Sequence, residues 1–366
     1  MTIGILKETQ KGEKRVSISP KIAKSLIEHG FNVIVEDGAG KSSKFENSDY
    51  KNVGARIEKR GAVYKDADVL VKINPFDEDG LKLVDKRHIL ICQLFHKSHP
   101  HIVEEIASRG ASIFSMDALP RISRAQDMDV LSSQNNLAGY KAVIKGAYEM
   151  TKIFPLMMTA AGTITPSRVL VYGVGVAGLQ AIATAKRLGA IVEATDIRVE
   201  TKEQAESLGA KFILVENDGE ASEKGYAKAA SEEYLQKQRE AVNKSLFQAD
   251  LVITTAMVPG RKSPVLITEE QVEQMKNGAV IIDLAAAQGG NCELSKMNKT
   301  VVRNGVKIVG TTIAPESVST NASDLYAQNM FNFIMYLTEN NEFKWDLEDE
   351  ITDETLIVHN GKIRKS

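Results

Sequence analysis

The 366-residue chain has little cysteine, no excess of charge of either sign and no long hydrophobic run. Its two cysteines, Cys92 and Cys292, do not suit a secreted disulfide framework and fit a reducing cytoplasm better. The 46 basic and 48 acidic residues leave a net charge of −2, so neither a nucleic acid nor an anionic membrane is expected as a partner. The N-terminus lacks the apolar stretch of a signal peptide, and no run of about 20 uncharged apolar residues predicts a membrane span.

Strand-like and helix-like segments instead alternate along most of the chain. In the first third they are predicted at Ile3–Leu6, Pro20–His29, Phe31–Val35, Val69–Ile73, His88–Leu94, Pro100–Ser108 and Ala111–Phe114. A second series of strands is predicted at Val169–Tyr172, Ile191–Thr195, Phe212–Leu214, Leu251–Thr254, Ala279–Asp283 and Lys307–Val309. Such alternation is typical of parallel sheets covered by helices, and it predicts an α/β fold.

The length of the chain suits two domains. Ser132–Phe154 is typical of one long helix that leaves the first domain, and a second helix at Asp324–Leu337 would lead the chain back to it. We therefore expect two Rossmann-like domains with parallel sheets, joined by two long helices. The N-terminal α/β domain would comprise residues 1–131 and 325–366, and the nucleotide-binding domain residues 132–324.

A polar, charged segment, Glu216–Glu240, interrupts the second domain. It is either a solvated surface insertion or a mobile loop that closes over bound nucleotide, because long loops in compact domains are often functional.

A glycine-rich motif follows the strand Val169–Tyr172 and precedes a helix of small residues, Leu179–Leu188. In the pattern G-x-G-x-x-G, Gly173 would permit the tight turn and Gly175 the close approach of a pyrophosphate. Gly178 would permit close packing of the helix on the strand, and the helix N-terminus offers N–H groups to the phosphates. The context on both sides predicts a dinucleotide-binding turn.

An acidic residue stands where such a fold binds the adenosine ribose. Asp196 ends the strand Ile191–Thr195, eighteen residues beyond Gly178. A carboxylate there accepts hydrogen bonds from the ribose 2′-hydroxyl and repels a 2′-phosphate, which favours NAD over NADP. Arg198 is the one nearby feature that would suit a phosphate.

Two further segments have both a bland and a functional interpretation. The small-residue turn Thr254–Gly260 follows a predicted strand, and it is either an ordinary β–α loop or a floor for the ribose and nicotinamide. Pro120–Ser133 gathers arginine, glutamine, aspartate and serine before the long helix. It is either a polar linker with a helix cap or a loop beside the nicotinamide in a cleft between domains.

Five passages resemble the NAD(H)-binding component, domain I, of the alpha subunit of proton-translocating nicotinamide nucleotide transhydrogenase. They are PRISRAQDMDVLSSQ, MTAAGTITPSRVLVYGVGVAGLQAIATAKRLGA, ESLGAKF, ITTAMVPGRKSPVLIT and IIDLAAAQGGNCE. They occur in the family's order and span nearly the whole chain. The RISRAQ loop is far more specific to the family than the glycine motif is.

The resemblance implies a role for particular residues. Those that hold and orient the nicotinamide would be Arg121, Gln126, Asp129 and Ser132. Those that bind the rest of the cofactor would be Gly173, Gly175, Val176, Gly178, Asp196, Ile197, Arg198, Gly225, Tyr226 and Met257. Among these, Asp196 matches the ribose-binding acid, and Gly225 and Tyr226 fall in a passage that resembles the family's mobile loop.

The resemblance also implies a reaction and its partners. Hydride passes directly between two nicotinamides, which requires alignment of the rings rather than an acid or base. NAD(H) would bind this chain, NADP(H) a separate component, and a membrane-spanning component would move the proton. The chain would then be a homodimer, peripheral on the cytoplasmic face of the inner membrane.

Alanine dehydrogenase, a related fold, is the alternative. Arg15, Lys72 and His96 resemble that enzyme's substrate-carboxylate, catalytic-lysine and histidine positions, although Arg15 and Lys72 would equally suit structural ion pairs. Against this interpretation, Ala287 stands where that enzyme has an aspartate. A third class, a non-enzymatic NAD-binding regulator, is favoured by nothing beyond the absence of an acid–base pair.

A metal site is not expected. His96, His99 and His101 are close in sequence, but histidines around a proline at the start of a helix are more often surface and capping residues. Cys292 lies beside the predicted cofactor turn, yet most lone cysteines are simply packed in the core.

Overall fold

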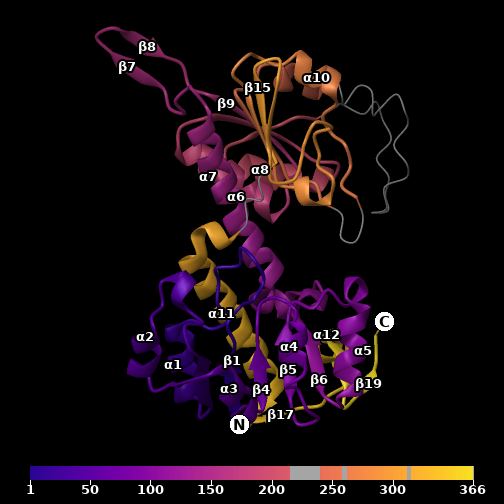
Figure 1. Ribbon diagram of the computed structural model, residues 1–366. Helices are drawn as coiled ribbons and strands as arrows, with labels where there is room; N and C mark the ends of the chain where they lie inside the picture. Colours follow the sequence, from indigo (N-terminus) through magenta and orange to yellow (C-terminus); the bar gives the residue numbers. More distant parts are fainter. Residues whose placement is uncertain (215–239, 258–261, 311–314, 366) are drawn as a thin grey trace. The chain divides into compact units, whose positions relative to one another are not determined.

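The computed structural model describes residues 1–214, 240–257, 262–310 and 315–365 (Figure 1). The chain forms two compact units, Met1–Gln134 with Pro315–Ser366, and Asn135–Ala314. The two crossings between them therefore lie three residues after the first boundary expected from the sequence and ten residues before the second. Each unit is built around its own sheet.

The first unit contains an eight-stranded sheet of order β19-β18-β6-β5-β4-β1-β2-β3. Its strands are β1 (Thr2–Ile5), β2 (Asn32–Glu36), β3 (Arg56–Glu58), β4 (Val69–Val71), β5 (Ile89–Cys92), β6 (Ser112–Ser115), β18 (Leu356–His359) and β19 (Lys362–Ile363). The strands from β6 to β3 in this order are parallel, whereas β18 pairs antiparallel with both β6 and β19. The C-terminal segment thus completes the N-terminal sheet.

Helices cover both faces of this sheet because its strands are apolar on both sides. One face packs against α1 (Pro20–Glu28) and α11 (Ser319–Leu337). The other packs against α3 (Arg60–Asp66) and α5 (Pro100–Ser108). The shorter helices are α2 (Asn47–Asn52), α4 (Glu78–Leu81) and α12 (Glu350–Thr355).

The second unit contains a seven-stranded sheet of order β11-β10-β9-β12-β13-β15-β14. Its strands are β9 (Arg168–Tyr172), β10 (Ile191–Thr195), β11 (Lys211–Phe212), β12 (Leu251–Thr254), β13 (Val280–Asp283), β14 (Thr300–Arg303) and β15 (Val306–Val309). All pairs are parallel except β14 with β15. Helices α6 (Val130–Glu149), α7 (Val176–Arg187) and α8 (Lys202–Ser207) pack on one face, and α10 (Glu269–Glu273) with the helical residues 240–246 on the other.

The predicted α/β class with two helix-covered Rossmann-like sheets is confirmed, with one correction: the sheets are parallel in their centres and antiparallel at three edge strands. A second correction concerns the long helices. Helix α6 ends at Glu149 rather than Phe154, because Ile153 and Phe154 use their carbonyls to bind Ser167, and Pro155 disfavours helix just before it. Helix α11 begins at Ser319, five residues earlier than expected.

A two-stranded hairpin, β7 (Met157–Thr159) with β8 (Gly162–Ile164), projects from the second unit (Figure 1). All six of its strand residues are exposed, including Met158, which is 76% exposed. The sequence pattern did not predict this hairpin.

Candidate functional site

The order of the second sheet contains a reversal at β9. From β9 the chain passes through α7 to β10 on one side, and it later returns to β12 on the other side. In parallel sheets, ligands bind outside the carboxyl ends of the strands at such a reversal. The residues of interest are therefore those that follow Tyr172, Thr195 and Thr254.

The glycine turn lies at this point and its geometry explains each glycine. Gly173 has a φ of +90°, and a Cβ on it would lie 2.5 Å from Thr255 Oγ1. A Cβ on Gly178 would lie 1.8 Å from the carbonyl oxygen of Gly173, so helix α7 approaches the turn too closely for any side chain. These two glycines are required by the fold itself.

Gly175 is different, because a Cβ on it would meet none of the described atoms within 4 Å. It is the N-cap residue of α7, and no side chain of the described residues caps the helix there. The first turn of α7 thus presents N–H groups and the positive end of the helix dipole to open space, an arrangement that suits a phosphate. Val176, the first residue of α7, is 38% exposed at the same place.

Asp196 lies next to the glycine turn, directly after β10. Its Oδ2 accepts a 2.7 Å hydrogen bond from the Val174 N–H, and the Arg198 guanidinium binds both of its oxygens at 3.0 Å. Burial alone raises the pKa of Asp196, but the hydrogen bonds from Arg198 and Val174 outweigh it and lower that pKa below its usual value. The carboxylate is therefore ionised near neutral pH, as hydrogen bonding to ribose hydroxyls requires.

A pocket opens between the glycine turn and the residues that follow Asp196. It is lined by Val174, Gly175, Val176, Leu179, Arg198, Glu200, Thr201 and Gln204. Ile197 projects into solvent with 87% of its side chain exposed. The structure thus brings together the predicted residues from the glycine motif and from Asp196 to Arg198.

The turn after β12 borders the same site. The Thr255 N–H and hydroxyl both donate to the carbonyl of Tyr172, and the hydroxyl also lies 3.1 Å from the carbonyl oxygen of Gly173. Met257 is 38% exposed at the end of this turn. Gly225 and Tyr226, and nearly all of the predicted segment Glu216–Glu240, lie outside the described residues.

The loop before α6 belongs to the first unit. Asp129 caps α6, since its Oδ1 accepts the Ser132 N–H at 2.9 Å and its Oδ2 accepts the Ser132 hydroxyl at 2.6 Å. Arg121 and Gln126 are exposed. The loop is held on α11 by Asn329, whose side chain donates to the carbonyl of Asp127 at 2.7 Å. The structure therefore joins Asp129 to Ser132 and leaves the other two side chains at the surface.

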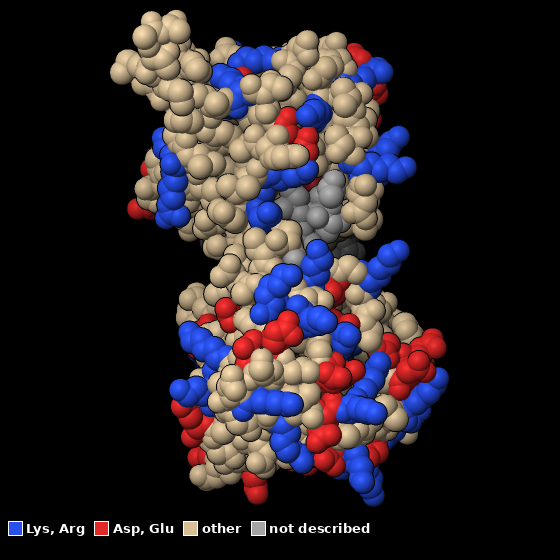
Figure 2. All heavy atoms as spheres, turned by 60° about the vertical axis from the view of Figure 1, so that its left-hand side comes forward, with Lys and Arg blue, Asp and Glu red and all other residues tan. Residues whose placement is uncertain are grey.

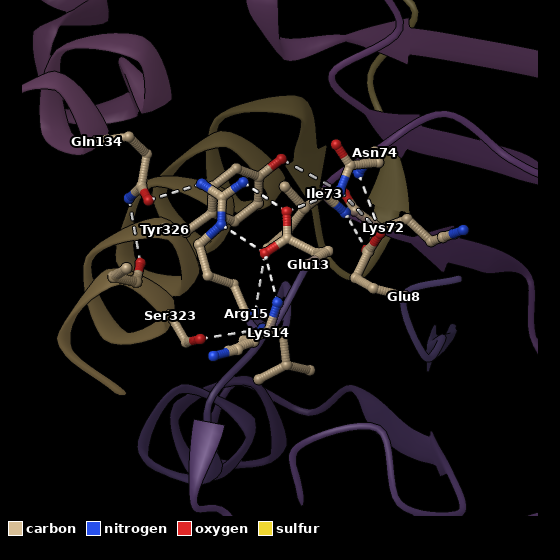
Figure 3. Close-up of polar contacts among 12 residues, drawn as sticks. Glu8, Glu13, Lys14, Arg15, Lys72, Ile73, Asn74, Gln134, Ser323 and Tyr326 are labelled. Carbon is tan, nitrogen blue, oxygen red and sulfur yellow. Dashed lines mark hydrogen bonds and ion pairs between the residues drawn. The ribbon is translucent and has the colours of Figure 1, made fainter. Parts of the chain in front are cut away.

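Two of the residues that suggested a dehydrogenase lie in a buried polar network in the first unit (Figure 3). Arg15 binds both carboxylate oxygens of Glu13, at 2.8 and 2.7 Å, and donates to Gln134 Oε1 at 2.8 Å. Lys72 is 1% exposed, and its Nζ lies 3.4 Å from Thr9 Oγ1. Burial lifts the pKa of Glu13, but the bonds from Arg15 outweigh this effect and hold that pKa below its usual value.

The histidines and cysteines take ordinary structural positions. His99 Nδ1 lies 2.9 Å from the Leu94 carbonyl at the start of α5, and burial lowers the pKa of His96. Cys92 and Cys292 are buried and reduced, and burial raises the pKa of Cys292 to about 11. Within the described ranges, no group of three or more potential ligands could hold a metal ion. No helix in this part of the chain is long and apolar enough to cross a membrane.

Two family models match the chain, that of the alanine dehydrogenase/PNT N-terminal domain over residues 4–138 and that of the C-terminal domain over residues 142–366. The chain is 49% identical over 374 residues to the first of the NAD(P) transhydrogenase alpha-subunit polypeptides of Rhodospirillum rubrum, with 99% of this chain and 97% of that protein covered.

Its fold is similar to the crystal structure of a transhydrogenase from Sinorhizobium meliloti, with a TM-score of 0.91, 40% identity and coverage of 99% and 100%. An L-alanine dehydrogenase structure is similar at a TM-score of 0.83 and 25% identity, with coverage of 100% and 97%. The resemblance seen in the five sequence passages is thereby confirmed.

Proposed function

Because the chain belongs to the alanine dehydrogenase/PNT family, we propose that it is the NAD(H)-binding subunit of a proton-translocating nicotinamide nucleotide transhydrogenase. The similarity to a transhydrogenase alpha subunit over nearly the full length of both chains carries this proposal. An L-alanine dehydrogenase is also similar in fold, but at lower identity. The oxidoreductase reaction would be direct hydride transfer to NADP(H) on a partner component, coupled to proton movement by a membrane-spanning component.

The nucleotide on this chain would be NAD(H) rather than NADP(H). The open N–H groups at Gly175 fit the pyrophosphate, and Asp196 fits the ribose hydroxyls and would repel a 2′-phosphate. Arg198 lies on Asp196 itself, so its charge is already neutralised by a carboxylate rather than available to a phosphate.

In the reaction, the bound nicotinamide supplies the carbon that gives or accepts hydride. The chain's own residues would only orient it. Asp129 and Ser132, tied to each other at the start of α6, would present a fixed polar edge to the ring, with Arg121 and Gln126 completing the contact from the same loop. No side chain in this set needs to transfer a proton.

The subunit would act as a homodimer on the cytoplasmic face of the inner membrane. The hairpin β7–β8 supports a dimer, since an isolated two-stranded hairpin is only marginally stable in water. Residues 155–166 contain no charged side chain, and Figure 2 shows the hairpin's projection free of blue and red spheres. An exposed apolar arm of this kind marks a protein contact, and a second copy of the chain would cover it.

The reaction is tested by a spectroscopic hydride-transfer assay. The purified chain receives NADPH and a spectrally distinct NAD analogue, with and without the NADP-binding component, while a parallel cuvette holds NAD and L-alanine. We expect transfer only when the component is present. Reduction of NAD by alanine in the chain alone would refute the proposal and establish the dehydrogenase.

The nucleotide preference is tested with a matched pair of variants. Asp196→Asn should weaken NADH binding at least about tenfold, as measured by nicotinamide fluorescence. Asp250→Asn is the control, because Asp250 also accepts one backbone N–H and pairs with a cation, Lys152, but precedes β12 at the opposite end of the strands. Equal weakening in both variants would refute the role of Asp196.

A further inference from the structure

A buried asparagine holds the turn that follows β12. We propose that Asn291 is a positioning residue for the nicotinamide half of the nucleotide site, acting through the turn Thr254–Met257. The site itself rests on the proposed function, whereas the clamp that Asn291 forms is a property of the structure. The sequence pattern did not single out Asn291, which stands inside the passage IIDLAAAQGGNCE.

The side chain of Asn291 pairs with both backbone groups of one residue. Its Oδ1 accepts the Ala256 N–H at 3.0 Å, and its Nδ2 donates to the Ala256 carbonyl at 2.8 Å. The second proton of Nδ2 is directed to the Pro264 carbonyl, also at 2.8 Å. Asn291 is fully buried, so these bonds form away from competing water. Only a primary amide offers one acceptor and two donors in this arrangement.

Asn291 is in turn fixed by a buried carboxylate at the end of β13. The Asn291 N–H donates to Asp283 Oδ2 at 2.8 Å, and the Thr254 hydroxyl donates to Oδ1 of the same side chain at 3.0 Å. Asp283 is 1% exposed and also accepts the N–H groups of Ala285 and Cys292. One carboxylate therefore anchors both the asparagine and the first residue of the turn that the asparagine clamps.

The chain reaches Asn291 through two residues in the left-handed region. Gly289 has a φ of +98° and Gly290 a φ of +83°, and a Cβ on Gly290 would lie 2.9 Å from Asp283 Oδ2. Other residues would be strained in this backbone. The glycine pair folds the segment back so that Asn291 lies beside the turn.

The clamped turn lies on the opposite side of β9 from Asp196. Strand β10, which carries Asp196 at its end, and strand β12, which carries the turn, flank β9 and its glycine turn. A dinucleotide with its adenosine ribose at Asp196 and its pyrophosphate at Gly175 must extend over the end of β12. Displacement of the turn therefore affects the nicotinamide half of the ligand and spares the adenosine half.

This difference gives the test. Asn291→Ala leaves both backbone groups of Ala256 without the amide, and we expect the turn to shift. The dissociation constants of NADH and ADP for the purified chain are measured by calorimetry. We expect the affinity for NADH to fall at least about tenfold and that for ADP, which has no nicotinamide half, to change less than about twofold. Equal weakening of the two ligands, weakening of ADP alone or no change in either would overturn the inference.

Gln271→Ala is the matched control. Gln271 closes the capping box of α10 in the same unit and donates to Asn243 at 2.6 Å, so its loss lowers stability without touching the turn. It should leave both dissociation constants unchanged. If Asn291→Ala does not fold, Thr254→Val replaces it, because that variant removes the hydroxyl bond to Asp283 and keeps the side-chain shape. The same selective loss of NADH affinity is expected, and its absence would overturn the inference.

The proposed function is tested separately by the hydride-transfer assay with the partner component. A wild-type chain that binds NADH and shows the selective loss in Asn291→Ala, but transfers no hydride to the component, would refute the transhydrogenase and leave the positioning role intact.

Discussion

Replacement of Gly175 by alanine separates the requirements of the fold from those of the ligand. The backbone at Gly175 has φ −86° and ψ −167°, which alanine adopts readily, and its Cβ would meet none of the described atoms within 4 Å. Stability should therefore stay constant or rise by about 0.4–1 kcal/mol, because alanine restricts the unfolded chain. The same Cβ would occupy the space into which a pyrophosphate must move, so the NADH dissociation constant should rise at least tenfold, or about 1.4 kcal/mol.

Gly178→Ala is the contrasting variant. Its Cβ would lie 1.8 Å from a backbone oxygen of Gly173, so the helix must move away from the turn. This overpacking should cost about 3 kcal/mol of the free energy of unfolding.

Urea unfolding and NADH fluorescence titration measure the two quantities on each variant. Gly61→Ala controls for the general effect of the substitution, because its Cβ also meets no described atom within 4 Å and it lies in α3 of the other unit. If Gly175→Ala binds NADH as tightly as the wild type, the open end of α7 is not the phosphate site. If it unfolds like Gly178→Ala, the geometry of the turn described above is wrong.

The helix cap, the hairpin and one ion pair each give a further prediction. Asp129→Ala should cost about 1 kcal/mol of stability by removing the cap of α6 and should also lower hydride transfer at least tenfold, whereas Asp129→Asn should keep the cap with Ser132 and restore stability but not transfer; restored transfer would reduce Asp129 to a cap. Met158→Asp should convert the dimer into monomers in sedimentation velocity, and an unchanged dimer would place the interface elsewhere. Burial raises the pKa of Asp77, but the hydrogen bonds from Arg60 and other donors lower it to about 2, below its ordinary 3.8. Because the folded pKa is the lower one, Asp77→Asn should cost about 1–2 kcal/mol at pH 7, and this cost should shrink as the pH falls from 3.8 towards 2 in urea titrations; a cost independent of pH would refute the charge–charge explanation.

The centres of both sheets could be predicted from sequence because buried parallel strands are continuous apolar runs. Strands β10 and β12 and helix α5 lie at the residues that the pattern indicated. The edge strands could not be predicted in the same way. Strand β14 has mostly exposed residues and β19 has only two, so neither carries the apolar signal, and their antiparallel pairing depends on partners chosen by the folded chain.

The glycine motif could be located from sequence because its spacing reflects backbone geometry. The same pattern could not separate the glycines that the fold needs from the one that faces open space, since this depends on the distances from each Cβ to its neighbours. For Arg15, the alternatives of substrate binding and ion pairing were both open from the sequence, and its bidentate contact with the neighbouring carboxylate of Glu13 is visible only in three dimensions.

Two aspartates at the carboxyl ends of neighbouring strands show how far residue type alone can be taken. Asp196 and Asp283 each end or follow a strand of the same sheet, and either would satisfy a pattern that asks for an acid after a strand. Asp196 pairs with a solvent-exposed guanidinium, which can yield to ribose hydroxyls at little cost because exposed ion pairs are weak. Asp283 is bound entirely by neutral donors in the interior, and a ligand could reach it only by breaking bonds that hold the backbone in place. The first carboxylate is therefore suited to bind a ligand and the second to shape the site, and this division of roles is what the contrasting variants at Asp196 and Asn291 measure.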